Sequence, residues 1–251
     1  MIKKLFIGCC THGDEQVGLS LAKKYPNGKN SYWNYQSVIC NPKAVKLNQR
    51  FVEQDLNRSF PGKQGIYYEE NRAFEITKLL EQVDFIIDIH QTTAQNNTCL
   101  IVNRISNLNF KCLQYFDIQN VIIDNYQDDD FEFGNKNAEH SGLCLDSVFP
   151  DKSMTVEYSQ NDKPESEFAI LEKDFNNFIE QKTIYSNKKY YTFVGLLAKK
   201  DFDLNIDLSN FVELTTEQKA IFGFEVKLEI CPCFIGEKAY DNIYCYWLKG
   251  V

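Results

Sequence analysis

Two short apolar runs in this chain each lead to a histidine at the point where a strand would end. Leu5–Gly8 is followed by Cys9-Cys10-Thr11-His12-Gly13-Asp14-Glu15, and Phe85–Ile87 is followed by Asp88-Ile89-His90. A short apolar run of this kind is typical of a buried strand in a parallel sheet. Because ligands bind beyond the carboxyl ends of such strands, the two histidines are expected to meet at one edge of the sheet.

The first two-thirds of the chain alternates strand-like and helix-like patterns. Helical spacing of apolar residues predicts helices over Asp14–Lys24, Glu69–Gln82 and Pro164–Lys182. Apolar runs predict strands over Leu5–Gly8, Tyr35–Cys40, Val83–Ile89, Thr98–Val102, Asn120–Asp124 and Met154–Glu157. This alternation predicts an α/β fold with a mostly parallel or mixed sheet and helices on both faces.

The character of the chain changes after about Asn187. Tyr190–Leu197, Glu225–Ile230 and Ile243–Leu248 are strand-like, and no long helical period lies between them. We therefore predict two domains, a catalytic domain over residues 1–187 and a small β-rich domain over residues 188–251.

Composition excludes several classes of protein. The chain has 43% hydrophobic and 25% charged residues, as globular proteins do, and its net charge of −8 argues against a nucleic-acid partner. No apolar stretch approaches the roughly 20 residues that span a bilayer, and the Met-Ile-Lys-Lys start is too short for a secretory signal. The nine cysteines are an odd number and lie in apolar surroundings, which suits a reducing compartment. We predict a cytoplasmic protein without a membrane partner.

His12, Glu15 and His90 together form a possible zinc site. Three protein ligands leave the fourth position of a tetrahedral zinc open for water, as a catalytic site requires. The spacing His-x-x-Glu also arises by chance, so a structural histidine beside an exposed glutamate is the alternative. The position of both histidines after strands favours the metal site, since the chain has only three histidines. The third, His140, either is structural or lines a substrate pocket.

The segment from Asn41 to Gly62 contains Arg50 and the sequence Asp55-Leu56-Asn57-Arg58. An arginine side chain can bind a carboxylate through two parallel hydrogen bonds, and a neighbouring asparagine can add a further donor. This segment therefore predicts a carboxylate-binding site. A solvated helix with surface arginines is the alternative reading of the same residues.

Five segments in this order resemble the succinylglutamate desuccinylase/aspartoacylase family, whose members are relatives of the zinc carboxypeptidases. They are His12–Glu15, Asn41–Arg58, Asp88–Thr93, Thr155–Glu157 and Pro232–Tyr240. The resemblance implies a zinc-carboxypeptidase-like fold with one zinc ion per chain. It also implies a zinc-dependent amidohydrolase that cleaves an N-acyl amino acid into a carboxylate and a free amino acid.

The resemblance assigns roles at the metal. His12, Glu15 and His90 would hold the zinc, which lowers the pKa of a bound water toward ~7. Glu157 would be the general base that takes a proton from water and passes it to the leaving amine. Asp88 either orients His90 or only ends its strand, and the residues leave both readings open.

The resemblance also assigns residues to the substrate. Arg50 would stabilise the oxyanion that forms from the amide carbonyl. Asn57 and Arg58 would bind the α-carboxylate of the amino acid, and Tyr240 would contact the substrate. The expected partner is thus a small-molecule N-acyl amino acid. The oligomeric state stays open, with a homo-oligomer among the alternatives.

One arginine of aspartoacylase has no counterpart here. In that enzyme an arginine about ten residues before the catalytic glutamate holds the second carboxylate of acetylaspartate. The corresponding residue is Ser147, and no arginine follows Arg104. This argues against acetylaspartate and leaves the acyl group and the amino acid open. The nearby Asp146 and Asp151 would suit a basic side chain.

Two other functions remain as alternatives. One is a carboxypeptidase-like peptidase that cuts short peptides, although a small C-terminal domain with Tyr240 near the site would exclude long chains. The other is a catalytically inactive protein that binds zinc or another ligand, although every catalytic residue type of the family is present.

Overall fold

A computed structural model describes residues 2–124, 144–160, 164–202 and 206–251 of the chain. Its framework is one sheet of ten strands in the order β2-β3-β1-β4-β7-β5-β6-β8-β10-β9. The strands are β1 (Lys3–Cys9), β2 (Asn27–Lys29), β3 (Trp33–Ile39), β4 (Phe85–Thr92), β5 (Cys99–Val102), β6 (Asn120–Ile123), β7 (Ser153–Ser159), β8 (Lys189–Ala198), β9 (Ile230–Cys233) and β10 (Ile243–Gly250).

The sheet is mixed. Strands β3, β1, β4 and β7 run parallel to one another, as do β5, β6 and β8. Strand β5 is antiparallel to β7, and β8, β10 and β9 form an antiparallel end of the sheet. The mixed α/β fold is therefore confirmed.

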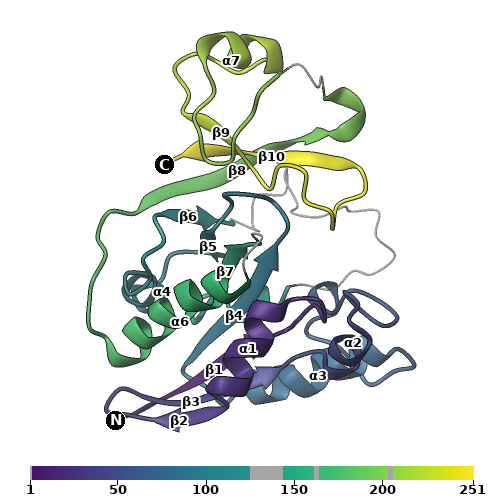
Figure 1. The fold of residues 1–251 in the computed structure, drawn as a ribbon, viewed down its shortest axis with the longest axis vertical. Helices are drawn as coiled ribbons and strands as arrows, with labels where there is room; N and C mark the ends of the chain where they lie inside the picture. The colour runs from purple at the N-terminus through teal and green to yellow at the C-terminus, as the bar shows by residue number, and fades with distance from the viewer. Residues whose placement is uncertain (1, 125–143, 161–163, 203–205) are drawn as a thin grey trace.

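Helices cover both faces of the parallel part of the sheet (Figure 1). The apolar faces of α1 (Gln16–Lys24), α4 (Asn107–Leu113) and α6 (Pro164–Glu180) share one core cluster with β1, β4 and β7. On the other face, α3 (Tyr68–Leu80), the 3-10 turn η1 (Leu56–Arg58) and α5 (Leu145–Val148) share a second cluster. A further short helix, α2 (Pro42–Leu47), begins directly after Asn41.

Side chains alternate along β4, so the strand supplies apolar residues to the core and polar residues to the candidate site. Successive residues of a strand point to opposite faces. Phe85, Ile87 and Ile89 enter the core under α1 and α6, whereas Ile86 packs in the cluster with α3. Asp88 and His90 continue the α3 side of the strand toward its carboxyl end. The apolar positions thus fix the register that places two polar side chains over the same face.

The predicted strand Glu225–Ile230 is wrong. The structure has turns up to Ile230, where β9 begins, and a helix, α7 (Thr216–Phe222), lies upstream. This helix depends on its caps. The side chain of Thr215 accepts from the Gln218 amide, the Gln218 side chain accepts from the Thr215 amide, and Gly223 ends the helix in the left-handed conformation.

The predicted boundary at residues 187/188 falls between α6 and β8. Backbone pairing joins Asn120–Ile123 of β6 to Lys189–Thr192 of β8, so the sheet is continuous across this point. The division into two domains stays a prediction. Within the described ranges, no helix combines the length and the apolar character that crossing a membrane requires.

Candidate metal centre and active site

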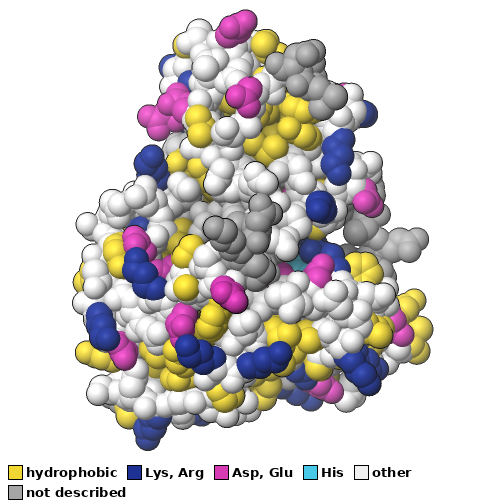
Figure 2. Space-filling view, in the orientation of Figure 1, with side chains coloured by type: hydrophobic (Ala, Val, Ile, Leu, Met, Phe, Trp, Pro, Cys, Tyr) yellow, Lys and Arg dark blue, Asp and Glu magenta, His cyan; other side chains and the backbone are white. Residues whose placement is uncertain are grey.

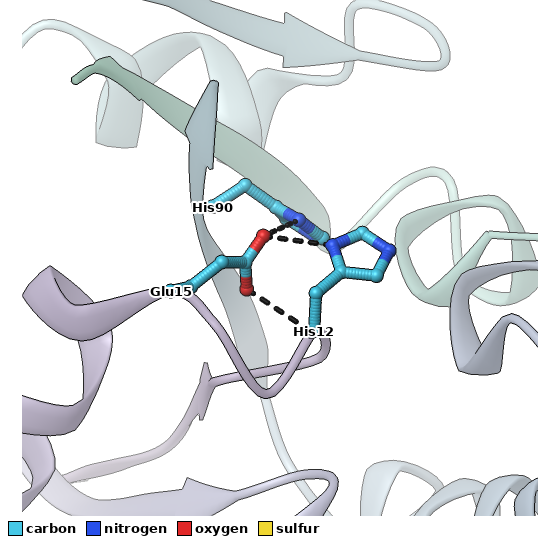
Figure 3. Close-up of side chains that lie close together, drawn as sticks. All are labelled: His12, Glu15 and His90. Atoms are coloured by element: carbon cyan, nitrogen blue, oxygen red, sulfur yellow. Dashed lines mark hydrogen bonds and ion pairs between the residues drawn. The ribbon is translucent and has the colours of Figure 1, made fainter. Parts of the chain in front are cut away.

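The structure brings His12, Glu15 and His90 together, and we call these three residues the metal cluster (Figure 3). Nδ1 of His12 lies 2.8 Å from Oε1 of Glu15, and Nδ1 of His90 lies 2.9 Å from the same oxygen. The three residues come from the turn after β1 and from the end of β4. None of them is more than 4% exposed. In Figure 2 only a small histidine area reaches this surface, in a hollow beside acidic and basic side chains.

The outer nitrogen of each imidazole faces a carboxylate. Nε2 of His90 lies 2.7 Å from Oδ2 of Asp88, and Nε2 of His12 lies 3.1 Å from Oδ1 of Asp55. With a metal bound, such carboxylates would hold the proton on Nε2 and leave the Nδ1 lone pairs free for the metal. Both Nδ1 atoms and the Glu15 carboxylate would then be available to one cation. The donor set therefore fits zinc, which prefers histidine nitrogen and carboxylate oxygen.

Charge keeps Glu15 ionised inside the protein. Burial by itself raises the pKa of a carboxyl, but the imidazoles of His90 and His12 hold the pKa of Glu15 well below its usual value. An ionised carboxylate is the form that binds a metal. This electrostatic setting is consistent with a ligand role for Glu15.

Two glycines make room for this arrangement. A Cβ on Gly8 would lie 2.8 Å from Oδ1 of Asp88, which also accepts a hydrogen bond of 2.9 Å from the Thr11 hydroxyl. A Cβ on Gly13 would lie 2.1 Å from the carbonyl carbon of Ala44 in α2. The turn that carries His12 can therefore pack directly on the backbone of α2.

Glu157 stands beside the metal cluster on the neighbouring strand. In the parallel pairing of β4 and β7 it lies directly opposite His90, so both side chains are on the same face. Burial raises the pKa of Glu157 to about 7; the charge of His90 opposes this rise, and those of Glu15 and Glu237 reinforce it. A carboxyl with this pKa can both accept and release a proton near neutral pH.

The segment before α3 places two arginines at the site. Asp55 links Arg50 to the metal cluster, because its Oδ2 accepts a hydrogen bond of 3.1 Å from Nη2 of Arg50 while its Oδ1 faces His12. Nη1 of Arg58 donates to the carbonyl oxygen of Asn57 at 2.8 Å and to Sγ of Cys144 at 3.2 Å. The side chain of Arg50 is 31% exposed.

Asn57 makes structural hydrogen bonds in addition to its predicted contact with the α-carboxylate of the substrate. Its Oδ1 accepts a hydrogen bond of 3.2 Å from the backbone N–H of Leu145, which docks α5 onto η1. Its own backbone N–H donates to Oδ1 of Asp55 at 2.8 Å. Asn57 therefore connects Asp55, which faces His12, to the start of α5, where Cys144 lies.

Sequence reasoning missed Glu69, which organises the loop before Asp55. Glu69 is fully buried, and its carboxylate accepts hydrogen bonds from the Asn41 side chain at 3.2 Å and from the Val52 backbone at 2.7 Å. The next two backbone amides, of Glu53 and Gln54, also donate to it. An acidic residue in the first turn of a helix was the only signal in the sequence.

Sequence reasoning also missed Glu237, which attaches the C-terminal segment to the end of β4. Its carboxylate accepts from the backbone N–H of Thr93 at 2.8 Å, from the Thr93 hydroxyl at 2.8 Å and from the hydroxyl of Thr92. Tyr240 lies shortly after it. Burial raises the pKa of Tyr240, and the positive charges of Arg58 and Arg50 oppose this rise. The ring of Tyr240 packs edge-on against that of Tyr246, with 5.4 Å between the ring centroids.

The remaining candidates divide into three groups. Asp88 contacts His90, which favours the orienting role over the simple end of a strand. Asp151 is 61% exposed and pairs with Arg104 at the surface, so the structure does not bring it to the site. Asp146 is buried, at 5% exposure, within electrostatic range of His90. His140 lies outside the described residues, and its two alternatives stay open.

Comparison with known proteins agrees with this geometry. The family model described as the succinylglutamate desuccinylase/aspartoacylase catalytic domain matches residues 1–145. The chain is 32% identical over 128 residues to a probable aspartoacylase of Trichodesmium erythraeum, covering 45% of this chain and 44% of that protein. It is 31% identical over 128 residues to an N-acyl-aromatic-L-amino acid amidohydrolase of Rattus norvegicus, covering 44% and 40%. The match spans less than half the length of these relatives.

Solved structures share the fold over the full chain. Murine aminoacylase 3 superposes with a TM-score of 0.68 at 18% identity, covering 100% of this chain and 96% of that one. Succinylglutamate desuccinylase from Chromobacterium violaceum superposes with a TM-score of 0.68 at 15% identity, covering 100% and 85%. The fold, the match over residues 1–145 and the ordered motifs lead to one conclusion: the chain belongs to the succinylglutamate desuccinylase/aspartoacylase family.

Proposed function

We propose that this protein is a zinc-dependent hydrolase that cleaves the amide bond of an N-acyl amino acid to a carboxylate and a free amino acid. The observation that carries the proposal is the metal cluster with Glu157 directly opposite His90 on the neighbouring strand. The similarity to a probable aspartoacylase and to N-acyl-aromatic-L-amino acid amidohydrolases supports the same substrate class.

His12, Glu15 and His90 would hold the zinc ion. When bound, zinc supplies the Lewis acidity that lowers the pKa of water to about 7. Asp55 and Asp88 keep the two imidazoles in the tautomer that offers Nδ1 to the metal.

Glu157 would act as the general base and then as the general acid. Its carboxylate takes a proton from the water that attacks the amide carbonyl carbon. The same carboxyl then gives that proton to the amine nitrogen as the carbon–nitrogen bond breaks. A pKa of about 7 suits both steps, because a group that titrates near the working pH exchanges its proton in both directions.

The arginines would hold the charges of the substrate. The guanidinium of Arg50 would stabilise the negative charge that develops on the carbonyl oxygen. Arg58 and Asn57 would bind the α-carboxylate of the amino acid, and Tyr240 would contact the same substrate. Asp55 positions Arg50 relative to the metal cluster.

A hydrolysis screen tests this proposal. Zinc-loaded protein is assayed against N-acetyl, N-succinyl and N-formyl amino acids and against short peptides, and the same panel is run with Glu157→Gln. We expect cleavage of N-acyl amino acids by the wild type, and a kcat lowered by roughly 10²- to 10⁴-fold in Glu157→Gln with the zinc content retained.

Each other outcome contradicts part of the proposal. Cleavage of peptides alone would identify the peptidase alternative. No cleavage of any compound would identify a binding protein without activity. Full activity in Glu157→Gln would remove Glu157 from the mechanism and leave the substrate class unaffected.

A further inference from the structure

The segment from Arg50 to Asp55 contacts the turn of His12 at both of its ends, and we call residues 50–55 the arginine loop. At one end the backbone N–H of Gly13 donates to the carbonyl oxygen of Arg50 at 3.1 Å. At the other end Oδ1 of Asp55 lies 3.1 Å from Nε2 of His12. The loop contains no helix or strand, so no regular backbone ladder sets its shape. That shape determines where the guanidinium of Arg50 lies relative to the metal cluster.

The carboxylate of Glu69 holds the middle of the arginine loop. The backbone N–H of Val52 donates to its Oε1 at 2.7 Å. The backbone N–H groups of Glu53 and Gln54 donate to its Oε2 at 3.2 Å and 3.3 Å. Three successive amides thus converge on one side chain, and the loop has to bend around it. Glu69 is itself fixed, because it is fully buried in the first turn of α3.

The same carboxylate also holds the other segment that packs on the His12 turn. Nδ2 of Asn41 donates to Oε1 of Glu69 at 3.2 Å. Oδ1 of Asn41 accepts from the backbone N–H of Ala44 at 3.2 Å and so caps α2, the helix whose backbone lies against Gly13. Glu69 therefore connects α2 to the arginine loop, and these two segments enclose the turn from both sides.

Within the described part of the chain, the hydrogen bonds of the Glu69 side chain go to Asn41 and to the arginine loop. An effect of Glu69 on the reaction must therefore pass through the loop. A small shift of the loop is sufficient, because a displacement of about 1 Å in a reacting geometry can cost roughly 100-fold in rate. Stabilisation of an oxyanion depends strongly on such geometry, since the donor has to meet the oxygen where its charge develops.

We propose that Glu69 is a positioning residue, which fixes the arginine loop so that the guanidinium of Arg50 meets the oxyanion that develops on the amide carbonyl. This inference rests on the proposed function, in which Arg50 has that role. It assigns the influence of Glu69 to kcat. The predicted ligands of the α-carboxylate, Asn57 and Arg58, follow the loop in η1, and Asn57 has a separate hydrogen bond to the backbone of Leu145.

The variant Glu69→Gln tests the inference. Glutamine has the same shape, but it keeps one acceptor oxygen and presents an NH2 group to amides that also donate. On the N-acyl amino acid cleaved fastest in the hydrolysis screen, we expect kcat to fall by roughly 10- to 100-fold. KM should change by less than about 3-fold, since the lost interaction belongs to the transition state. Zinc content should stay at the wild-type value, and urea unfolding should show that the variant is folded under the assay conditions.

A double-mutant cycle with Arg50→Ala separates positioning from a merely structural role. If Glu69 acts through Arg50, the double variant should have the kcat/KM of Arg50→Ala alone to within about 3-fold, because the guanidinium that Glu69 positions is no longer present. A residue that supports only the fold would lower kcat/KM by the same factor whether Arg50 is present or not.

Two further variants complete the experiment. Glu75→Gln is the matched control, because Glu75 is in the same helix, is 63% exposed and pairs with Arg72, and it is expected to keep the wild-type kcat. Glu69→Asp keeps both acceptor oxygens on a shorter side chain and takes the place of Glu69→Gln in the cycle if that variant does not fold.

The outcomes separate this inference from the proposed function. Wild-type kcat in Glu69→Gln, or an equal loss with and without Arg50, overturns the positioning role and leaves the deacylase intact. Loss of folding in both Glu69 variants also overturns it, because Glu69 would then support the fold as a whole. If the wild type cleaves no N-acyl amino acid, the proposed function fails and this inference fails with it.

Discussion

The metal cluster and the attachment of Glu237 both lie at the carboxyl end of β4, but they are held in different ways. In the metal cluster each histidine has a carboxylate on either side, and no member is more than 4% exposed. At Glu237 a single carboxylate accepts hydrogen bonds from the backbone N–H and hydroxyl of Thr93 and from the hydroxyl of Thr92. The proposed chemistry therefore depends on histidines paired with carboxylates, whereas the attachment of the C-terminal segment depends on hydrogen bonds alone. Substitutions in the two regions should therefore have effects of different size and kind.

The largest expected effect is the loss of the metal. His90→Ala removes one of the three proposed zinc ligands and the imidazole that contacts the buried carboxylates of Glu15 and Asp88. We expect bound zinc to fall from about one equivalent to none after dialysis, with activity lost. Metal analysis and kcat measure this.

The conservative variant Asp88→Asn is the matched comparison. It keeps all three ligands and should weaken zinc binding by only roughly 10- to 100-fold. Full zinc retention in His90→Ala would show that the cluster does not hold the metal.

A smaller effect is expected from Gly8→Ala, which reaches the metal cluster indirectly. The new Cβ would lie 2.8 Å from Oδ1 of Asp88 and push that carboxylate away from His90. Zinc affinity, measured by competition with a chelator, should fall at most as far as in Asp88→Asn, roughly 10- to 100-fold.

Gly195→Ala is the control for Gly8→Ala, since its nearest neighbour would be 3.6 Å away, an ordinary contact. Wild-type affinity in both glycine variants would mean that the position of Asp88 has no influence on the metal.

The smallest expected effect is at Glu237, which attaches the C-terminal segment to the end of β4. Glu237→Gln keeps one acceptor oxygen and replaces the other with an NH2 group, which cannot accept the hydrogen bonds that Thr92 or Thr93 donates there. We expect the free energy of unfolding in urea to fall by about 1–3 kcal/mol, because buried donors lose their acceptor. KM should rise more than kcat falls, since the segment contains Tyr240 and no metal ligand.

Glu225→Gln is the matched control for Glu237→Gln. Glu225 is 66% exposed and pairs with the exposed Lys227, so its replacement should change the stability by less than about 0.5 kcal/mol. Equal stability of the two variants would indicate that the hydrogen bonds of Glu237 contribute nothing to the free energy of unfolding.

The strands predicted from the sequence are confirmed where their apolar residues pack against helices and their backbones pair with neighbouring strands. The strands β1, β4 and β7 pack against helices on one face, β1 and β4 also pack against helices on the other, and their apolar runs are clear. Val226, Leu228 and Ile230 alternate in the same way, yet only Ile230 is in a strand. Backbone pairing explains the difference: β10 ends at Gly250, and its register with β9 reaches no further than Lys249 opposite Ile230. A strand needs a neighbour, and the sequence period does not show where the neighbour stops.

The sequence by itself determined the metal cluster and Glu157, because each of these residues is at or beyond the end of an apolar run and parallel strands end at the same edge. Only the tertiary structure decided which other groups meet them. Asp55 reaches His12 across 43 residues, and Glu237 reaches Thr92 across 145. The hydrogen bond from Arg58 to Cys144 spans 86 residues in the same way. Contacts of this kind leave no period in the sequence, since they arise where loops from different strands converge.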